Sequence, residues 1–316
     1  MRTIDLVSKY VRKLKREQLH SPRTIISYES DLKQFAQYTG ESREIHTISE
    51  HLINRYFRDL TDARRLSPST ISRKICTVRG FFQHLENDDI LLRSPVSRFH
   101  LKTKIHRKSP TYITPEEISQ LFNVIREEYQ NTGKKLQKRR DRGDKDRLVE
   151  YQLFCIVRNS VLFRILLLTG IKLGELVTIK SEQVQLLRKS CIIYPERNVK
   201  DQYKITNPET LNLLRKYRKQ VKYFNFRSHF FFFNRNMGQL STVIIQKIFK
   251  SYIDRAGIKR KLTPSSLRHA FAVNLFQQKT DLNTIRDKLG YKTFEGLLLY
   301  QKYFNTSSQS KGDNKS

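Results

Sequence analysis

Three helices of this chain can be placed from the residues that begin them. Ser21-Pro22, Ser67-Pro68 and Thr114-Pro115 each pair a hydroxyl side chain, which can accept a hydrogen bond from a free backbone N–H, with a proline whose fixed φ suits the first helical turn. Glu117 gives the third start the Thr-x-x-Glu form of a capping box. Apolar residues recur at helical spacing behind the first two starts. The sequence therefore predicts a largely helical protein.

A small β-sheet is expected in the second half of the chain. Residues 191–206 contain two short alternating stretches on either side of a polar turn, which is typical of a β-hairpin. Phe230 to Phe233 predict a further short strand, and helices are expected again from Thr242 to about Tyr303. The predicted fold class is therefore mainly α with a small β-sheet, an α+β arrangement.

Changes in composition divide the 316 residues into parts. Ser94-Pro95 ends the first helical region, and the segment 96–111 that follows has five Lys or Arg, two His and little apolar periodicity. Residues 130–150 are dense in charge and predict an exposed loop. We expect a helical domain at 1–95, a basic linker at 96–111, a second domain at 112–305 and a disordered tail at 306–316.

The charge of the chain points to a polyanionic partner. Lys and Arg number 61 against 30 Asp and Glu, a formal net charge of +31. Neutralised phosphates release condensed counterions, so this excess favours a nucleic acid as the partner, with a membrane surface second and a ribosomal or packaging role as the other nucleic-acid alternative. Two basic groups predict a phosphate-facing surface, with an ordinary solvated face as the alternative for each: Arg73, Lys74 and Arg79, then Lys138, Arg139 and Arg140.

Targeting and cofactor signals are sparse in this sequence. The first residues, MRTIDLVSKYVRK, are charged and carry no apolar signal core, and the most apolar stretch, 160–171, is shorter than a bilayer requires. Cys76, Cys155 and Cys191 lie far apart and are each expected to pack in the core of a reduced protein. We therefore expect a cytoplasmic protein with no membrane partner, metal or cofactor.

The chain lacks the motifs of several common enzymes. The sequence contains no Walker A loop, GxGxxG, HExxH or GxSxG pattern, and no acidic cluster spaced for two metals. A DNA-processing enzyme without such a metal site must activate a phosphodiester in another way. A covalent nucleophile supported by fixed positive charge is the obvious one.

Three ordered motifs resemble those of one enzyme family. Residues 262–272 (LTPSSLRHAFA) resemble the LTPHxLRHxFA box of the tyrosine recombinases, or integrases, and residues 168–176 (LTGIKLGEL) resemble their TGxRxxEL box. Residues 289–291 (LGY) resemble the LGH element, which the nucleophilic tyrosine follows by nine residues; here that residue is Tyr300. The helical region at 1–95 is similar to the family's N-terminal DNA-binding domain. The resemblance covers roughly residues 5–303.

The resemblance implies that residues 112–305 form a catalytic domain. Enzymes of this family attack a DNA phosphodiester with tyrosine and form a 3′-phosphotyrosine link, which keeps the bond energy without metal or ATP. Tyr300 would be the nucleophile, with Tyr303 as a less well-spaced rival, and Arg268 would hold a non-bridging oxygen through its planar guanidinium. The resemblance also implies a two-domain clamp on duplex DNA and a tetramer on two paired sites, formed by this chain alone or with a related recombinase.

The family's catalytic set is altered at three positions of this chain. Lys172 stands at the first arginine position, and an ammonium group cannot give the bidentate hold of a guanidinium. Ser265 replaces a histidine and cannot act as a base near neutral pH. Tyr291 replaces a second histidine, at a position where the family also accepts tryptophan. His269 is expected to be a structural histidine rather than a substitute base.

The family also places a lysine in the hairpin, where it protonates the leaving 5′-oxygen. Counting back from Pro208 puts Arg197 or Lys200 at that position. Lys200 is the better chemical choice, because an arginine hardly releases a proton near neutral pH. An ordinary charged turn is the alternative.

Two functions are consistent with these residues. The first is site-specific DNA recombination or integration for a plasmid or other mobile element. The second is DNA binding by a recombinase-derived protein with little or no cleavage, acting in regulation or plasmid maintenance. A ribosomal protein would explain the charge but not the three ordered motifs.

Overall fold

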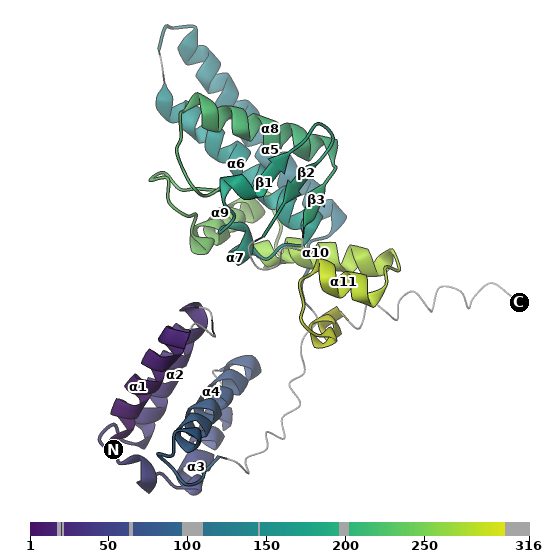
Figure 1. Cartoon of the computed structure of the whole chain (residues 1–316). Helices are drawn as coiled ribbons and strands as arrows, with labels where there is room; N and C mark the ends of the chain where they lie inside the picture. Colours follow the sequence, from purple (N-terminus) through teal and green to yellow (C-terminus); the bar gives the residue numbers. More distant parts are fainter. Residues whose placement is uncertain are drawn as a thin grey trace, which may run out of the picture. The chain divides into compact units, whose positions relative to one another are not determined.

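The computed structural model describes residues 1–17, 20, 22–62, 66–96, 110–144, 146–195 and 202–300. The chain divides into two compact units, Met1–His106 and Arg107–Ser316, and each is described by itself. Figure 1 shows a helical first unit and a larger second unit that contains a small sheet. The predicted fold class is confirmed. The division falls inside the predicted linker, most of which lies outside the described residues, and the predicted domain boundaries stay a prediction.

The described part of the first unit is a bundle of helices. In chain order these are α1 (Thr3–Glu17), α2 (Pro22–Thr39), the short 3-10 helix η1 (Ile45–Thr47), α3 (Glu50–Asp62) and α4 (Pro68–Asn87). The helix α2 begins at the predicted proline, and Ser67 caps α4 by accepting a hydrogen bond from the Thr70 backbone N–H. The bundle closes on an apolar core in which Phe35 of α2 meets Phe82 of α4, both fully buried.

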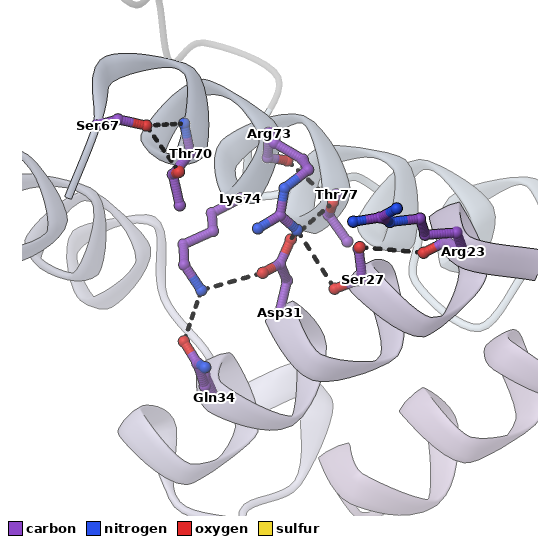
Figure 2. A network of polar contacts seen from close by, with 9 residues as sticks. All are labelled: Arg23, Ser27, Asp31, Gln34, Ser67, Thr70, Arg73, Lys74 and Thr77. Carbon is purple, nitrogen blue, oxygen red and sulfur yellow. Dashed lines mark hydrogen bonds and ion pairs between the residues drawn. The ribbon is translucent and has the colours of Figure 1, made fainter. Parts of the chain in front are cut away.

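A buried ionic network joins α2 to α4 (Figure 2). Asp31 of α2 is 2% exposed and accepts hydrogen bonds from the Arg73 guanidinium and from Lys74 Nζ, the latter at 3.0 Å. Lys74 also donates to Gln34 Oε1 at 2.5 Å. Such charges can be buried only where they are paired and hydrogen-bonded. Lys74 is therefore an internal residue, and the prediction that it belongs to a phosphate-facing surface is wrong.

The described part of the second unit combines a long central helix with a small sheet and further helices (Figure 1). Its elements are α5 (Pro115–Arg140), α6 (Arg147–Thr169), α7 (Leu173–Leu176), η2 (Ser181–Gln183), β1 (Val184–Leu186), β2 (Cys191–Ile193), β3 (Tyr203–Ile205), α8 (Pro208–Tyr223), α9 (Thr242–Arg255), α10 (Pro264–Gln277), α11 (Leu282–Lys288) and η3 (Phe294–Tyr300). The predicted capping box of Thr114 and Glu117 begins α5.

The helix α6 is the centre of this unit, packed against α5, α8 and α10. Its 23 residues are long and apolar enough to cross a membrane by length and composition, so the prediction that residues 160–171 are too short does not hold for the helix as a whole. However, 72% of its most apolar window is buried inside the unit. That burial explains the apolar composition, because a core helix needs apolar residues on most of its circumference.

The predicted hairpin is present, and a third strand extends it. The strands β2 and β3 pair antiparallel with Cys191 opposite Ile205, and β1 pairs with the other edge of β2 with Val184 opposite Ile193. Ile193 and Ile205 are buried, whereas Lys204 between them in the ladder is exposed, so one face of the sheet meets the core. The turn at 196–201 lies outside the described residues.

Three further predictions need correction. Residues 130–140 are the last turns of α5 rather than a loop, because Leu136 packs against Val149 and Leu153 of α6. The stretch Phe230–Phe233 forms only isolated bridges, since its rings are used to fill the core instead of extending the sheet. Cys76 is exposed, because it lies off the apolar face of α4, whereas Cys191 is buried and Cys155 half-buried.

Asp31→Asn should lower the free energy of unfolding by about 3 kcal/mol, because Lys74 would then be buried beside a neutral amide. Glu29→Gln is the matched control. Glu29 lies on the same helix and also pairs with two lysines, Lys15 and Lys33, but these more exposed pairs are worth less than about 1 kcal/mol. Chemical denaturation followed by circular dichroism measures both variants, and equal losses would contradict this account of the network.

Candidate active site

The first motif forms the end of α6 and the short helix after it. Gly170 caps α6 in the left-handed conformation, with φ +65°, and Lys172 is the N-cap residue of α7. A β-carbon at Gly170 would overlap the ring of Phe271 and lie 3.2 Å from Leu289 Cδ2. Glycine is therefore required twice over, by the backbone conformation and by the close approach of the other two motifs.

Arg268 connects the three motifs. Its side chain projects from α10, is 6% exposed and donates from Nη1 to the Gly170 carbonyl oxygen and from Nη2 to the Leu289 carbonyl oxygen, the latter at 2.6 Å. Each carbonyl ends a helical segment, α6 in one case and α11 in the other, where backbone acceptors have no partner within the helix. One guanidinium thus satisfies both acceptors and brings the three motifs to a single point.

Tyr291 lies beside this arginine. Gly290 ends α11 with φ +60°, and the chain then turns so that the half-buried Tyr291 ring lies 5.3 Å from Arg268 Cζ. Gly296 of η3 packs directly on that ring, because a β-carbon there would lie 2.5 Å from Tyr291 Cδ1. The aromatic residue at the family's second histidine position therefore positions η3 against α10 and can stack on the guanidinium.

Tyr300, the predicted nucleophile, ends η3 and is fully buried. Its ring packs on Phe276 of α10, with centroids 5.6 Å apart, and its hydroxyl lies 2.6 Å from Nδ1 of His269. Burial and the neighbouring Arg268 charge lower the pKa of His269 to about 4. The imidazole is therefore neutral at physiological pH and can accept a hydrogen bond from the tyrosine hydroxyl.

Two of the altered positions are open to solvent. Lys172 is 37% exposed at its side chain, with Nζ 3.4 Å from a carboxylate oxygen of Glu175. Ser265 is exposed in the first turn of α10, one turn before Arg268 on the same side of the helix. Lys200 and Arg197, the two candidates in the hairpin, lie outside the described residues, as does Tyr303.

His269, predicted to be a structural histidine rather than a substitute base, makes a contact that the sequence did not predict. Its ring does pack in the unit, but it also reaches the hydroxyl of Tyr300. The helical spacing carries a signal of this, because Ala272, Val273 and Phe276 follow His269 at intervals of three, four and seven residues and are all buried. This face of α10 carries the C-terminal apolar cluster that contains Tyr300.

The basic residues proposed for DNA contact behave differently from one another. Arg73 is held by Asp31 with 39% of its side chain exposed, and Arg79 is half-buried. In the second unit, Lys138 is exposed, whereas Arg139 pairs with Asp146 and Arg140 with Glu150 at 2.6 Å. The two arginine side chains are about half exposed, whereas the carboxylates that they pair with are only 13% and 14% exposed. The role of these residues in binding DNA stays a prediction.

Comparison with known proteins identifies the family. The model of the phage integrase family matches residues 147–306, and that of the phage integrase N-terminal SAM-like domain matches residues 7–88. The tyrosine recombinase XerC of Halalkalibacterium halodurans is 25% identical over 304 residues, which are 93% of this chain and 91% of that protein. The chain therefore belongs to the phage integrase family and is, by class, a tyrosine-type DNA recombinase.

Solved structures share the same fold. The XerH site-specific recombinase bound to a palindromic difH substrate matches with a TM-score of 0.72 at 18% identity, over 98% of this chain and 83% of that one. The Tn1549 transposon integrase in complex with transposon right end DNA matches with a TM-score of 0.68 at 15% identity, over 98% of each chain. At these identities the likeness is one of fold.

Gly170→Ala should destabilise the second unit by about 2 kcal/mol more than Gly143→Ala, because overpacking is added to backbone strain. Both glycines have positive φ, +65° and +81°, but a β-carbon at Gly143 would meet no atom within 4 Å, whereas one at Gly170 would overlap Phe271. Denaturant unfolding of the two variants measures the difference. Equal stabilities would mean that Phe271 of α10 does not pack tightly against the backbone at Gly170.

Proposed function

We propose that this chain is a site-specific recombinase that cleaves duplex DNA through a 3′-phosphotyrosine intermediate formed by Tyr300. The observation that carries the proposal is the joining of the three motifs by Arg268, which hydrogen-bonds the backbone of the first and third motifs and is followed by His269, the residue in contact with Tyr300. A guanidinium has five N–H donors, and two of them are engaged in these bonds. We assign the remaining donors to a phosphate oxygen, on which negative charge builds up as the nucleophile attacks.

The proposed substrate is double-stranded DNA. The net charge of +31 supports an electrostatic clamp on phosphates, and the matched XerH and Tn1549 integrase structures are described as complexes with DNA. We further propose a tetramer on two paired sites, formed by this chain alone or with a related recombinase. The mobile-element or plasmid setting, the cytoplasmic location and the independence from metal and cofactors also belong to this proposal.

The side chains around Tyr300 have distinct proposed roles. Arg268 holds a non-bridging phosphate oxygen, and Lys172 adds a second positive charge at the N-terminus of α7. Tyr291 stacks near Arg268, and Ser265 can donate one hydrogen bond. Lys200, or Arg197 in its place, is proposed to supply the proton to the leaving 5′-oxygen.

The second candidate function is DNA binding with little or no cleavage, in regulation or plasmid maintenance. It is favoured by Lys172 and Ser265, which replace an arginine and a histidine of the family's usual set. It is also favoured by the complete burial of Tyr300 in the free chain, since a buried hydroxyl must move to reach a phosphate. Retention of Arg268 in its box favours the first function.

Nicked suicide DNA carrying the element's own sites should trap a covalent protein–DNA adduct, visible as a slow band on a denaturing gel. Tyr300→Phe should abolish the adduct, because it removes the attacking oxygen and little else. Tyr303→Phe is the matched control and should retain it. A wild-type chain that shifts the duplex but forms no adduct would favour the second function, and an adduct from Tyr300→Phe would show that the nucleophile is another residue.

Lys172→Arg should raise the rate of adduct formation on the order of tenfold, because a planar guanidinium can hold two phosphate oxygens where an ammonium acts as a point charge. Lys180→Arg, the same exchange at the N-cap of η2, is the control and should leave the rate unchanged. Single-turnover assays on the suicide substrate measure both. An unchanged or lower rate for Lys172→Arg would place this residue outside the catalytic set.

A further inference from the structure

The contact between His269 and Tyr300 is not accounted for by the family's usual catalytic set. The Nδ1 atom of His269 lies 2.6 Å from Tyr300 Oη, and the two rings are inclined at 53° with centroids 5.8 Å apart. The two residues come from α10 and η3. The contact is therefore made where η3, which follows the third motif, packs on α10, the helix of the second motif. In this geometry a proton can pass between the two atoms without an intervening water.

Ser265, which stands where the family has a histidine, cannot accept the proton of Tyr300. Ser265, at the family's first histidine position, has a hydroxyl that binds a proton only in strong acid, and it lies exposed in the first turn of α10. The charged group that acts on His269 is Arg268, and the C-terminal apolar cluster that contains Tyr300 also has Tyr112 and Tyr291 packed against it. A guanidinium has no acceptor site, and a phenol oxygen is a weaker hydrogen-bond acceptor than an imidazole nitrogen. Among these described side chains, only His269 offers an imidazole nitrogen, which lies at the Tyr300 hydroxyl and can accept its proton.

We infer that His269 is the proton acceptor for Tyr300 in the cleavage step, in place of the missing histidine at position 265. This inference rests on the proposed function. In the step, the bond from Tyr300 Oη to phosphorus forms, the bond from phosphorus to the 5′-oxygen breaks, and the phenolic proton passes to His269 Nδ1. The 5′-oxygen takes up a proton from Lys200 or from water, and His269 returns its proton when the free 5′-hydroxyl attacks in the reverse direction.

The position of Arg268 next to His269 makes the proton transfer dependent on DNA. In the free chain, burial and the charge of Arg268 hold the pKa of His269 near 4, so the histidine cannot take the proton of a phenol. A phosphate bound to Arg268 brings a negative charge that offsets the guanidinium. It therefore stabilises the imidazolium that forms when Tyr300 reacts. His269 therefore takes the proton when the scissile phosphate is in place and while the Tyr300 hydroxyl, turned towards that phosphate, is still within hydrogen-bond reach of Nδ1.

His269→Asn and His269→Gln test this role, because an amide oxygen keeps a hydrogen-bond acceptor near Tyr300 but cannot take its proton. Each should lower the rate of adduct formation by at least about 100-fold with unchanged DNA affinity. His229→Asn, at an exposed histidine of the same unit, is the matched control and should react like wild type. Above neutral pH, the rate of the Asn variant should rise about tenfold per pH unit, since solvent must then ionise the phenol, while the wild-type rate should rise less steeply.

A second substrate shows at which oxygen His269 acts. In DNA with a 5′-bridging phosphorothiolate at the cleavage site, the leaving sulfur needs no proton because thiols ionise near pH 8.5. The defect of the His269 variants should persist on this DNA, whereas the defect of Lys200→Ala should disappear. Restoration of the His269 variants by the sulfur would overturn the inference and place His269 at the leaving group.

The remaining outcomes also decide the matter. Rates for both His269 variants within threefold of wild type would overturn the inference and leave His269 a packing residue. Faster adduct formation would overturn it as well, because the hydrogen bond would then serve only to hold Tyr300 in its buried position. Absence of an adduct from the wild-type chain on both substrates would instead overturn the proposed function, and with it the reaction that His269 is inferred to serve.

Discussion

The two hydrogen bonds from Arg268 to backbone carbonyls determine the arrangement of everything around the candidate active site. They join Gly170 at the end of α6 to Leu289 at the end of α11, and both carbonyls need a donor because helix ends leave them unsatisfied. The residue proposed to hold a phosphate oxygen is thereby part of the fold. Loss of Arg268 would remove the proposed phosphate ligand and also the two bonds that join the three motifs, so a defect in an Arg268 variant would report on both effects together.

The first unit depends on a comparable polar interaction, a buried ionic network between α2 and α4. Asp31 holds Arg73 and Lys74 on the neighbouring helix, and the carboxylate is almost fully buried (Figure 2). One negative charge between two cations leaves the cluster with a net positive charge, while Arg73 is still partly exposed. The network therefore contributes to the packing of α2 on α4 and presents a positioned guanidinium at the surface of the unit.

Much of the fold could be predicted from the sequence, and the limits have physical causes. Proline-led helix starts and the alternating hairpin are local signals, so Pro22, Ser67 and the Thr114 capping box were located correctly. Lys74 is buried because it pairs with Asp31, which lies 43 residues away in the sequence. The local sequence pattern around Lys74 does not predict this pairing. The same holds for the site. Motif spacing predicts Tyr300 and Arg268 as site residues, but the contact of Tyr300 with His269 arises from the packing of η3 on α10, which one sequence does not specify.

The burial of Tyr300 also affects the free energy of DNA binding, because the ring must be exposed before it can react. Removing a large aromatic side chain from an apolar cluster costs about 2 kcal/mol, a factor of roughly 30 in an equilibrium constant. If the ring leaves the cluster of Phe276 and Leu297 to reach DNA, this cost is drawn from the contacts that the rest of the chain makes with the duplex. The measured affinity of a complex with the tyrosine exposed would then understate the strength of those contacts. A chain that binds a duplex while Tyr300 stays in its apolar cluster would form a complex in which the proposed nucleophile cannot reach the DNA.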